Sequence, residues 1–141
     1  MKNSDLFVSP RKMKSFIDTR LNIILKDREF KSSHVPYIFE IGNNDGCSMK
    51  ELSILIGSDK GLTTRVVRNL IENDYVTNIT ESSRTYRLYL TEKGIEAYDI
   101  SKVAMDQIFE FLFECLNSED KENLKSITSK LNKRLDESYK Y

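Results

Sequence analysis

Hydroxyl and basic side chains gather in residues 60–68 of this 141-residue chain. They are Lys60, Thr63, Thr64, Arg65 and Arg68, and no acidic residue occurs in residues 60–71. Threonine can hydrogen-bond base edges or phosphates, and an arginine guanidinium can bind guanine with two hydrogen bonds or hold a phosphate. We therefore predict that Thr63, Thr64 and Arg65 read bases of double-stranded DNA. The two other cations, Lys60 and Arg68, are predicted to hold phosphates.

Two further arginines, Arg84 and Arg87, belong to a predicted β-hairpin. Residues 75–80 and 85–90 are rich in β-forming residues, and the polar run 81–84 separates them. Side chains alternate along the second run, so Arg87 lies on the face opposite Leu88. We expect Arg87 to hold a phosphate and Arg84, at the loop, to enter a minor groove.

Two short helices joined by a tight turn are predicted just before this hairpin. Ser48 and Glu51 form a capping box at the start of the first helix. Gly57 permits the left-handed backbone of a sharp exit, and Ser58 or Asp59 can cap the second helix. Helix, turn, helix and hairpin together predict a winged helix-turn-helix. The stripe of the second helix that should face the core consists of Leu62, Val66, Val67, Leu70 and Ile71.

Longer helical patterns flank this region on both sides. Ser9 or Pro10 is expected to open the first of them, Thr91 to cap a long helix through about Leu116, and Ser118 to open the last. The fold class expected is mainly α with a small antiparallel β-hairpin wing, in one domain over residues 1–141. The last helix carries an apolar seam made of Leu124, Ile127, Leu131 and Leu135.

We interpret residues 9–31 and 91–139 as dimerisation helices and residues 33–90 as the DNA-binding lobe. Three aromatic residues, Phe109, Phe111 and Phe113, occupy more than one face of the long helix. A helix with one face open to solvent carries apolar residues on the other face only. The alternative is that these apolar faces all pack within one monomer.

Composition excludes several classes of function. The chain has 22 Lys and Arg against 22 Asp and Glu, so binding to nucleic acid must depend on a local surface. No Ser/His/Asp arrangement, Gly-rich phosphate loop or metal-ligand spacing occurs, which predicts no enzyme, cofactor or metal site. The absence of a long apolar run and of a secretory signal predicts a cytoplasmic protein with no membrane association.

Residues 48–94 resemble the winged helix of the MarR family of prokaryotic transcriptional regulators. Three passages carry the resemblance: DKGLTTRVVRNLIENDYV, Arg84 six residues before Leu90, and LTEKG at 90–94. The family wing usually carries an Asp-Arg-Arg type of run, and Ser82-Ser83-Arg84 stands there in this chain. The resemblance implies a DNA-binding transcriptional regulator, and repression is the role that we expect. It also implies a homodimer, formed by the N- and C-terminal helices, on a pseudo-palindromic operator.

Family resemblance also implies a small anionic aromatic ligand that releases the DNA. Arg20 and Tyr37 lie on the helices that would line the ligand crevice. Cys47 has two interpretations, an oxidation sensor as in some family members, or a structural thiol, which we favour because no second cysteine is nearby. Two alternatives stay open for the basic residues: solvated charges on an exposed helix, or a winged-helix protein–protein interaction module without a DNA target.

Overall fold

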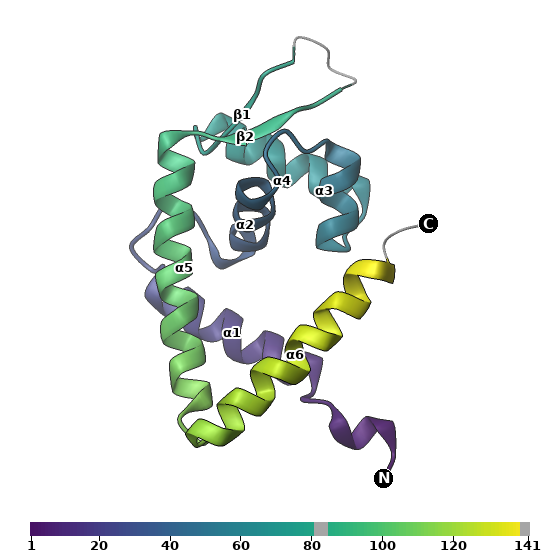
Figure 1. Cartoon of the computed structure of the whole chain (residues 1–141). Helices are drawn as coiled ribbons and strands as arrows, with labels where there is room; N and C mark the ends of the chain where they lie inside the picture. Colours follow the sequence, from purple (N-terminus) through teal and green to yellow (C-terminus); the bar gives the residue numbers. More distant parts are fainter. Residues whose placement is uncertain (81–84, 139–141) are drawn as a thin grey trace. The chain divides into compact units, whose positions relative to one another are not determined.

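The computed structural model describes residues 1–80 and 85–138. The chain forms two compact units, Met1–Met105 and Asp106–Tyr141. Helices dominate and one short antiparallel hairpin follows α4 (Figure 1), which confirms the predicted fold class of a mainly α protein with a β-hairpin wing. The elements are η1 (Asn3–Leu6), α1 (Pro10–Ile24), η2 (Ser32–His34), α2 (Val35–Asn43), α3 (Met49–Ile56), α4 (Lys60–Glu72), β1 (Val76–Asn78), β2 (Leu88–Leu90), α5 (Glu92–Phe113) and α6 (Ser118–Ser138).

Serine hydroxyls begin two of the helices at the positions predicted from the sequence. The Ser9 hydroxyl accepts a hydrogen bond of 3.3 Å from the amide of Lys12 at the start of α1. The Ser48 hydroxyl accepts one of 3.1 Å from the amide of Glu51 at the start of α3. The first amides of a helix have no partner within the helix, so each cap satisfies a donor that would otherwise depend on water.

The turn between α3 and α4 is made by a glycine and an aspartate. Gly57 ends α3 with a φ of 75°, the left-handed conformation that the sequence predicts there. Asp59, one of the two predicted candidates, caps α4 by accepting a hydrogen bond of 2.7 Å from the amide of Leu62. Because both helix ends are fixed locally, α4 leaves α3 in a defined direction.

The core of the first unit lies where α2, α3, α4 and β2 pack against one another. Burying the side chain of a valine, leucine or isoleucine stabilises the folded state by about 1.5–3 kcal/mol. This packing holds α4 with one side against the core and the other side open to solvent. The largest fully buried apolar side chains are those of Ile38, Ile41, Leu52, Val67, Leu70, Val76 and Leu88.

The buried side of α4 differs by about one residue from the predicted stripe. It comprises Thr63, Val67 and Leu70, whereas Leu62 is 39 % exposed. The prediction that Leu62 faces the core is therefore wrong. Thr63 can take the inner position because its hydroxyl donates to the carbonyl of Asp59 at 3.0 Å, so this buried hydroxyl has a hydrogen-bond partner.

The hairpin has shorter regular strands than the sequence predicts. Val76 pairs with Leu90, and Asn78 pairs with Leu88. Beyond this point the side-chain oxygen of Asn78 accepts two hydrogen bonds, one of 3.0 Å from the amide of Arg87 and one of 3.2 Å from the amide of Thr80. Since the Asn78 side chain takes hydrogen bonds that a partner strand would otherwise accept, the regular ladder ends there.

Close backbone contact joins the start of α5 to the residue that precedes β1. The amide of Gly94 donates to the hydroxyl of Thr91 at 3.0 Å, which confirms Thr91 as the cap of this helix. A Cβ atom placed on Gly94 would lie 2.0 Å from the carbonyl oxygen of Tyr75. Only glycine fits this position.

The second unit comprises the end of α5 and the whole of α6. The rings of Phe109 and Phe113 stack with their centroids 5.6 Å apart. Asn117 and Asp120 cap α6 reciprocally, each side chain accepting from the other residue's amide at 2.8 and 3.1 Å. The seam predicted from the sequence is at least 36 % exposed at each of its residues, which are Leu124, Ile127, Leu131 and Leu135.

Candidate nucleic-acid interface

The solvent side of α4 carries most of the residues predicted to bind DNA. Its cations, Lys60, Arg65 and Arg68, are all exposed. Among the described residues the ion pairs are Lys14–Asp18 and Lys93–Glu29, so no α4 cation is neutralised by such a pair. These cations therefore form a positively charged strip on one helix. The shallow surface that they share is lined by Lys60, Gly61, Thr64, Arg65, Arg68, Asn69 and Glu72.

Thr64 lies on this surface with one of its hydrogen-bonding functions already used. Its hydroxyl donates to the carbonyl of Lys60 at 2.7 Å, and the side chain is half-buried. The hydroxyl oxygen can still accept a hydrogen bond, and the methyl group is apolar. Thr64 is thus suited to accept from an exocyclic amino group of a base or to contact a thymine methyl.

Thr63 must be removed from the predicted DNA-binding residues. Its side chain is 0 % exposed, and its hydroxyl donates to Asp59 within the helix. A fully buried side chain cannot reach a base edge. The sequence prediction failed here because the type of residue suggested a polar surface, while the packing of α4 on α3 determines which side faces inward.

The predicted wing residues are described only in part. Arg87 is exposed, and its backbone is fixed because its amide donates to Asn78 and its carbonyl accepts from Ile79 at 3.2 Å. Arg87 therefore stands on a defined backbone beside the end of the ladder. Arg84 lies outside the described residues.

Solved structures show which known proteins share this arrangement. A MarR transcriptional regulator from Methanosarcina mazei superimposes with a TM-score of 0.81 at 21 % identity, covering 99 % of this chain and 93 % of that chain. MarR from E. coli gives a TM-score of 0.72 at 17 % identity, covering 89 % and 97 %. This chain has the MarR fold. No family model and no curated protein matches the sequence.

A third structure with the MarR fold was solved with a ligand. It is a MarR family protein of Mycobacterium tuberculosis in complex with salicylic acid, with a TM-score of 0.69 at 15 % identity, covering 86 % of this chain and 91 % of that chain. At these identities the likeness establishes the fold alone. The chemistry of α4 must be argued from its own side chains.

Two polar residues of the α4 surface were missed by the sequence reasoning. Asn69 and Glu72 are exposed and line the same depression as Arg65 and Arg68. Both would have been found by placing Thr63 on the inner side, because the opposite side then centres on Arg65, Arg68 and Glu72. Asn69 can bond adenine with two hydrogen bonds, whereas the carboxylate of Glu72 repels phosphates.

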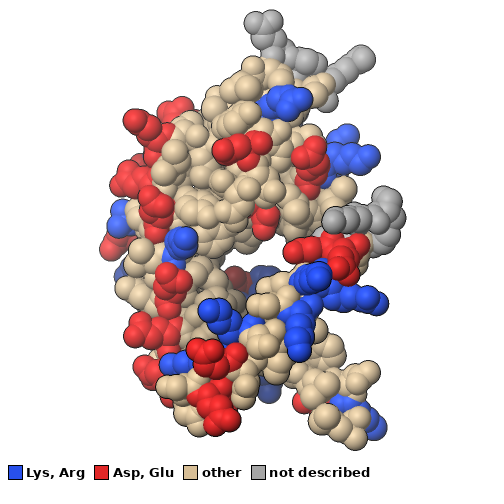
Figure 2. All heavy atoms as spheres, viewed as in Figure 1, with Lys and Arg blue, Asp and Glu red and all other residues tan. Residues whose placement is uncertain are grey.

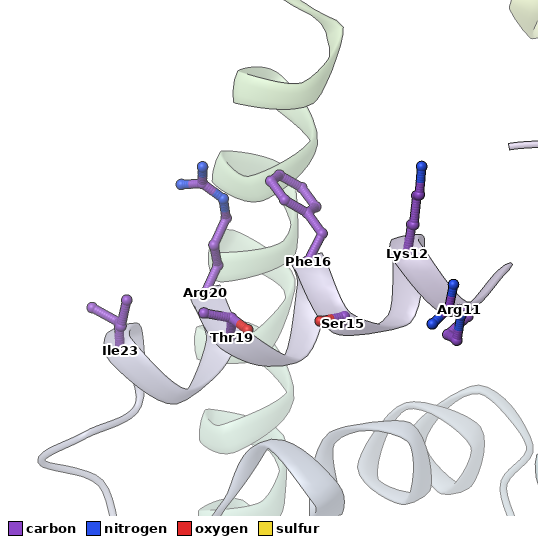
Figure 3. Close-up of a pocket in the computed structure, with 7 residues that line it drawn as sticks. All are labelled: Arg11, Lys12, Ser15, Phe16, Thr19, Arg20 and Ile23. Atoms are coloured by element: carbon purple, nitrogen blue, oxygen red, sulfur yellow. The ribbon is translucent and has the colours of Figure 1, made fainter. Parts of the chain in front are cut away.

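A second exposed surface lies along α1 (Figure 3) and consists of Arg11, Lys12, Ser15, Phe16, Thr19, Arg20 and Ile23. The guanidinium carbon of Arg20 lies 4.6 Å from the centre of the Phe16 ring, a cation–π contact. Tyr37, which was predicted with Arg20 to line a ligand crevice, is 5 % exposed, and its hydroxyl lies 3.0 Å from that of Ser58. The α1 surface therefore contains Arg20 but not Tyr37.

Burial protects the thiol of Cys47. The side chain is 2 % exposed. Burial, together with the nearby carboxylates of Glu51, Glu40 and Asp45, raises the pKa of the Cys47 thiol to about 11. Because the thiolate is the form that reacts with oxidants, this environment supports the structural interpretation of Cys47 over the oxidation sensor.

Charge on the molecule is distributed unevenly. Figure 2 shows acidic side chains gathered over α5, so the basic character of α4 is local. In residues 1–80 and 85–138, no group of three or more His, Cys, Asp or Glu side chains is placed to hold a metal ion. No helix of this part is long and apolar enough to cross a membrane.

Proposed function

We propose that this chain is a sequence-specific DNA-binding transcriptional regulator that binds a pseudo-palindromic operator as a homodimer. The observation that carries the proposal is the solvent side of α4. Its three exposed cations and Thr64 stand on the second helix of a helix-turn-helix, and a packed core holds that helix in place. In this motif the second helix enters the major groove.

Each side chain of the proposed interface has a distinct task. Arg65 and Thr64 read base edges in the major groove, where each base pair presents a different pattern of donors and acceptors. Lys60, Arg68 and Arg87 hold phosphates and fix the position of the protein on the duplex. The proposed contact of Arg84 with a minor groove rests on the sequence alone.

Dimerisation is proposed because α6 presents an apolar seam to solvent. Ile127, Leu131 and Leu135 are each more than half exposed, and they recur along one side of the helix. A stripe of this kind needs a partner, and a second copy supplies a matching stripe. A dimer would place two α4 helices in successive major grooves, about 34 Å apart.

Repression and release by a ligand complete the proposal. A dimer on an operator blocks other proteins from the same DNA, and its place of action is the cytoplasm of a prokaryotic cell. The α1 surface offers Arg20 and Lys12 to a carboxylate and Phe16 to an aromatic ring. This chemistry suits small anionic aromatic compounds, of which the salicylic acid bound to the Mycobacterium tuberculosis protein is an example. A panel of such acids that alters neither the melting temperature nor the DNA affinity would remove the ligand from the proposal.

Salt dependence of DNA binding tests the main proposal. Affinity for random duplex DNA, measured by fluorescence anisotropy at several salt concentrations, should fall steeply as salt rises. Three phosphate contacts per copy, those of Lys60, Arg68 and Arg87, predict a slope of log K against log salt near −5 for a dimer. A flat response, or no binding, would contradict the proposal.

The second candidate function is a winged-helix module that binds proteins and has no DNA target. Two observations favour it: the chain carries equal numbers of basic and acidic residues, and Glu72 shares the α4 surface with the arginines. Selection of bound sequences from a random oligonucleotide pool separates the two candidates. Enrichment of one sequence supports the regulator, and an unenriched pool supports the module.

A further inference from the structure

Lys93, on the first turn of α5, connects two distant segments of the first unit. Its ammonium donates to the carboxylate of Glu29 at 2.9 Å and to the carbonyl of Asn73 at 3.0 Å. It also lies 4.5 Å from the centre of the Tyr75 ring. Glu29 belongs to the segment between α1 and α2, and Asn73 is the residue that ends α4. One side chain therefore bridges the α1–α2 segment and the end of the DNA-binding helix.

The contact with Asn73 acts at the end of α4 where a cation stabilises the helix. The last carbonyls of a helix have no partner within the helix and carry partial negative charge. Lys93 supplies a donor and a positive charge there. Thr91 supplies two more contacts, because its amide donates to the carbonyl of Tyr75 at 3.1 Å and its hydroxyl to that of Asp74. The exit of α4 is thus held on the start of α5.

Glu29 extends this contact to the α1–α2 segment. The hydrogen bond and charge of Lys93 lower the pKa of Glu29, so its carboxylate stays ionised at neutral pH. The hydroxyl of Tyr75 donates to the same carboxylate at 3.4 Å, and the rings of Phe30 and Tyr75 meet edge to face with centroids 5.8 Å apart. Glu29 and Phe30 of the α1–α2 segment are therefore both in contact with Tyr75, which follows α4.

We propose that Lys93 and Glu29 form a positioning pair that sets the orientation of α4 for DNA, and this inference rests on the proposed function. Neither residue contacts DNA in this account. They act through the carbonyl of Asn73 and the residues that follow it. Their effect on affinity should be moderate, because the Lys93 side chain is 42 % and the Glu29 side chain 74 % exposed.

The test compares substitutions of the pair on an oligonucleotide selected by the wild-type protein. We expect Lys93→Met and Glu29→Gln each to weaken binding about fivefold. The double variant should be no weaker than Lys93→Met alone, since that substitution already removes the link to Glu29 together with the contact to Asn73. Lys93→Arg should restore most of the affinity, because arginine can also donate to both partners. Glu96→Gln removes a carboxylate about one turn along α5, from the depression that Glu29, Tyr75 and Lys93 also line, and serves as the matched control.

Glu29→Gln gives the sharpest comparison. It removes a negative charge, so simple repulsion from phosphates predicts tighter binding, whereas the positioning pair predicts weaker binding. Tighter or equal binding by Glu29→Gln, or losses that add in the double variant, would overturn the inference. A shallower salt slope for Lys93→Met would also overturn it, because that result identifies Lys93 as a phosphate contact. A wild-type chain that binds no oligonucleotide would instead contradict the proposed function itself.

Discussion

Replacing Gly94 with alanine should destabilise the first unit, although Gly94 lies in the first turn of a helix, where alanine is normally preferred. The added Cβ would lie 2.0 Å from the carbonyl oxygen of Tyr75, whereas real Cβ contacts essentially never fall below 3.0 Å. The backbone at Tyr75 or at Gly94 must therefore move by at least about 1 Å. That movement disturbs the hydrogen bond of 3.1 Å from the amide of Thr91 to the same oxygen.

These contacts determine how much the free energy of unfolding should fall. Forced overpacking in a core typically costs about 1–3 kcal/mol. A weakened backbone hydrogen bond adds about 1 kcal/mol. We expect Gly94→Ala to lower the free energy of unfolding by about 2–4 kcal/mol, a large share of the stability of a small domain.

Gly61→Ala is the matched control for this measurement. Gly61 also lies in the first turn of a helix, but its added Cβ meets only the side-chain oxygen of Asp59, at 3.3 Å. Helix propensity favours alanine here by up to about 1 kcal/mol. Against this, the Asp59 side chain that caps α4 must shift by a few tenths of an ångström, so Gly61→Ala should change stability much less than Gly94→Ala. Both variants are compared by urea unfolding followed by circular dichroism, at one protein concentration. A loss of stability for Gly61→Ala as large as that for Gly94→Ala would refute the steric argument.

Five further predictions concern the α4 surface, the core and the α6 seam. Arg68→Ala should weaken binding to all duplex sequences alike and reduce the salt slope of a dimer by about 2, measured by anisotropy; an unchanged slope would show that Arg68 holds no phosphate. Thr63→Val should leave DNA affinity unchanged while Thr64→Val lowers it, because only Thr64 reaches the surface. Iodoacetamide at pH 8 should label exposed Cys115 well before Cys47, whose pKa of about 11 keeps the thiol protonated. Since that pKa is raised from 9.0, the folded state holds the Cys47 proton more tightly, and this contribution to stability should be lost as pH rises from about 9 to 11 in unfolding titrations. Leu131→Asp should shift the species seen in sedimentation from dimer to monomer, and a monomeric wild type would contradict the proposed α6 interface.

Local chemistry explains which parts of the fold could be predicted from the sequence. The caps at Ser48 and Thr91 and the left-handed Gly57 depend on residues within a few positions of one another. The hairpin also follows from local β-forming patterns. Its regular strands are shorter than predicted, because the side chain of Asn78 accepts a hydrogen bond from the amide of Arg87. A pattern of β-forming residues does not show this alternative.

Packing between distant segments explains what could not be predicted. The rotation of α4 that buries Thr63 and exposes Leu62 depends on how α4 meets α3. Asn69 was missed for the same reason. Lys93 and Glu29 are separated by 64 residues, so no sequence pattern indicated their contact. In each case the residue type was visible, but its neighbours were fixed only by the fold.

Hydroxyl-radical footprinting on a duplex selected from a random pool tests the central account most directly. Two copies of the chain, each presenting Arg65 and Arg68 to a major groove, should protect two backbone segments whose centres lie about 10 base pairs apart. Arg65→Ala together with Arg68→Ala should remove both protected segments at once. A single protected segment, a complex with one chain per duplex, or protection that survives the double substitution would contradict the account.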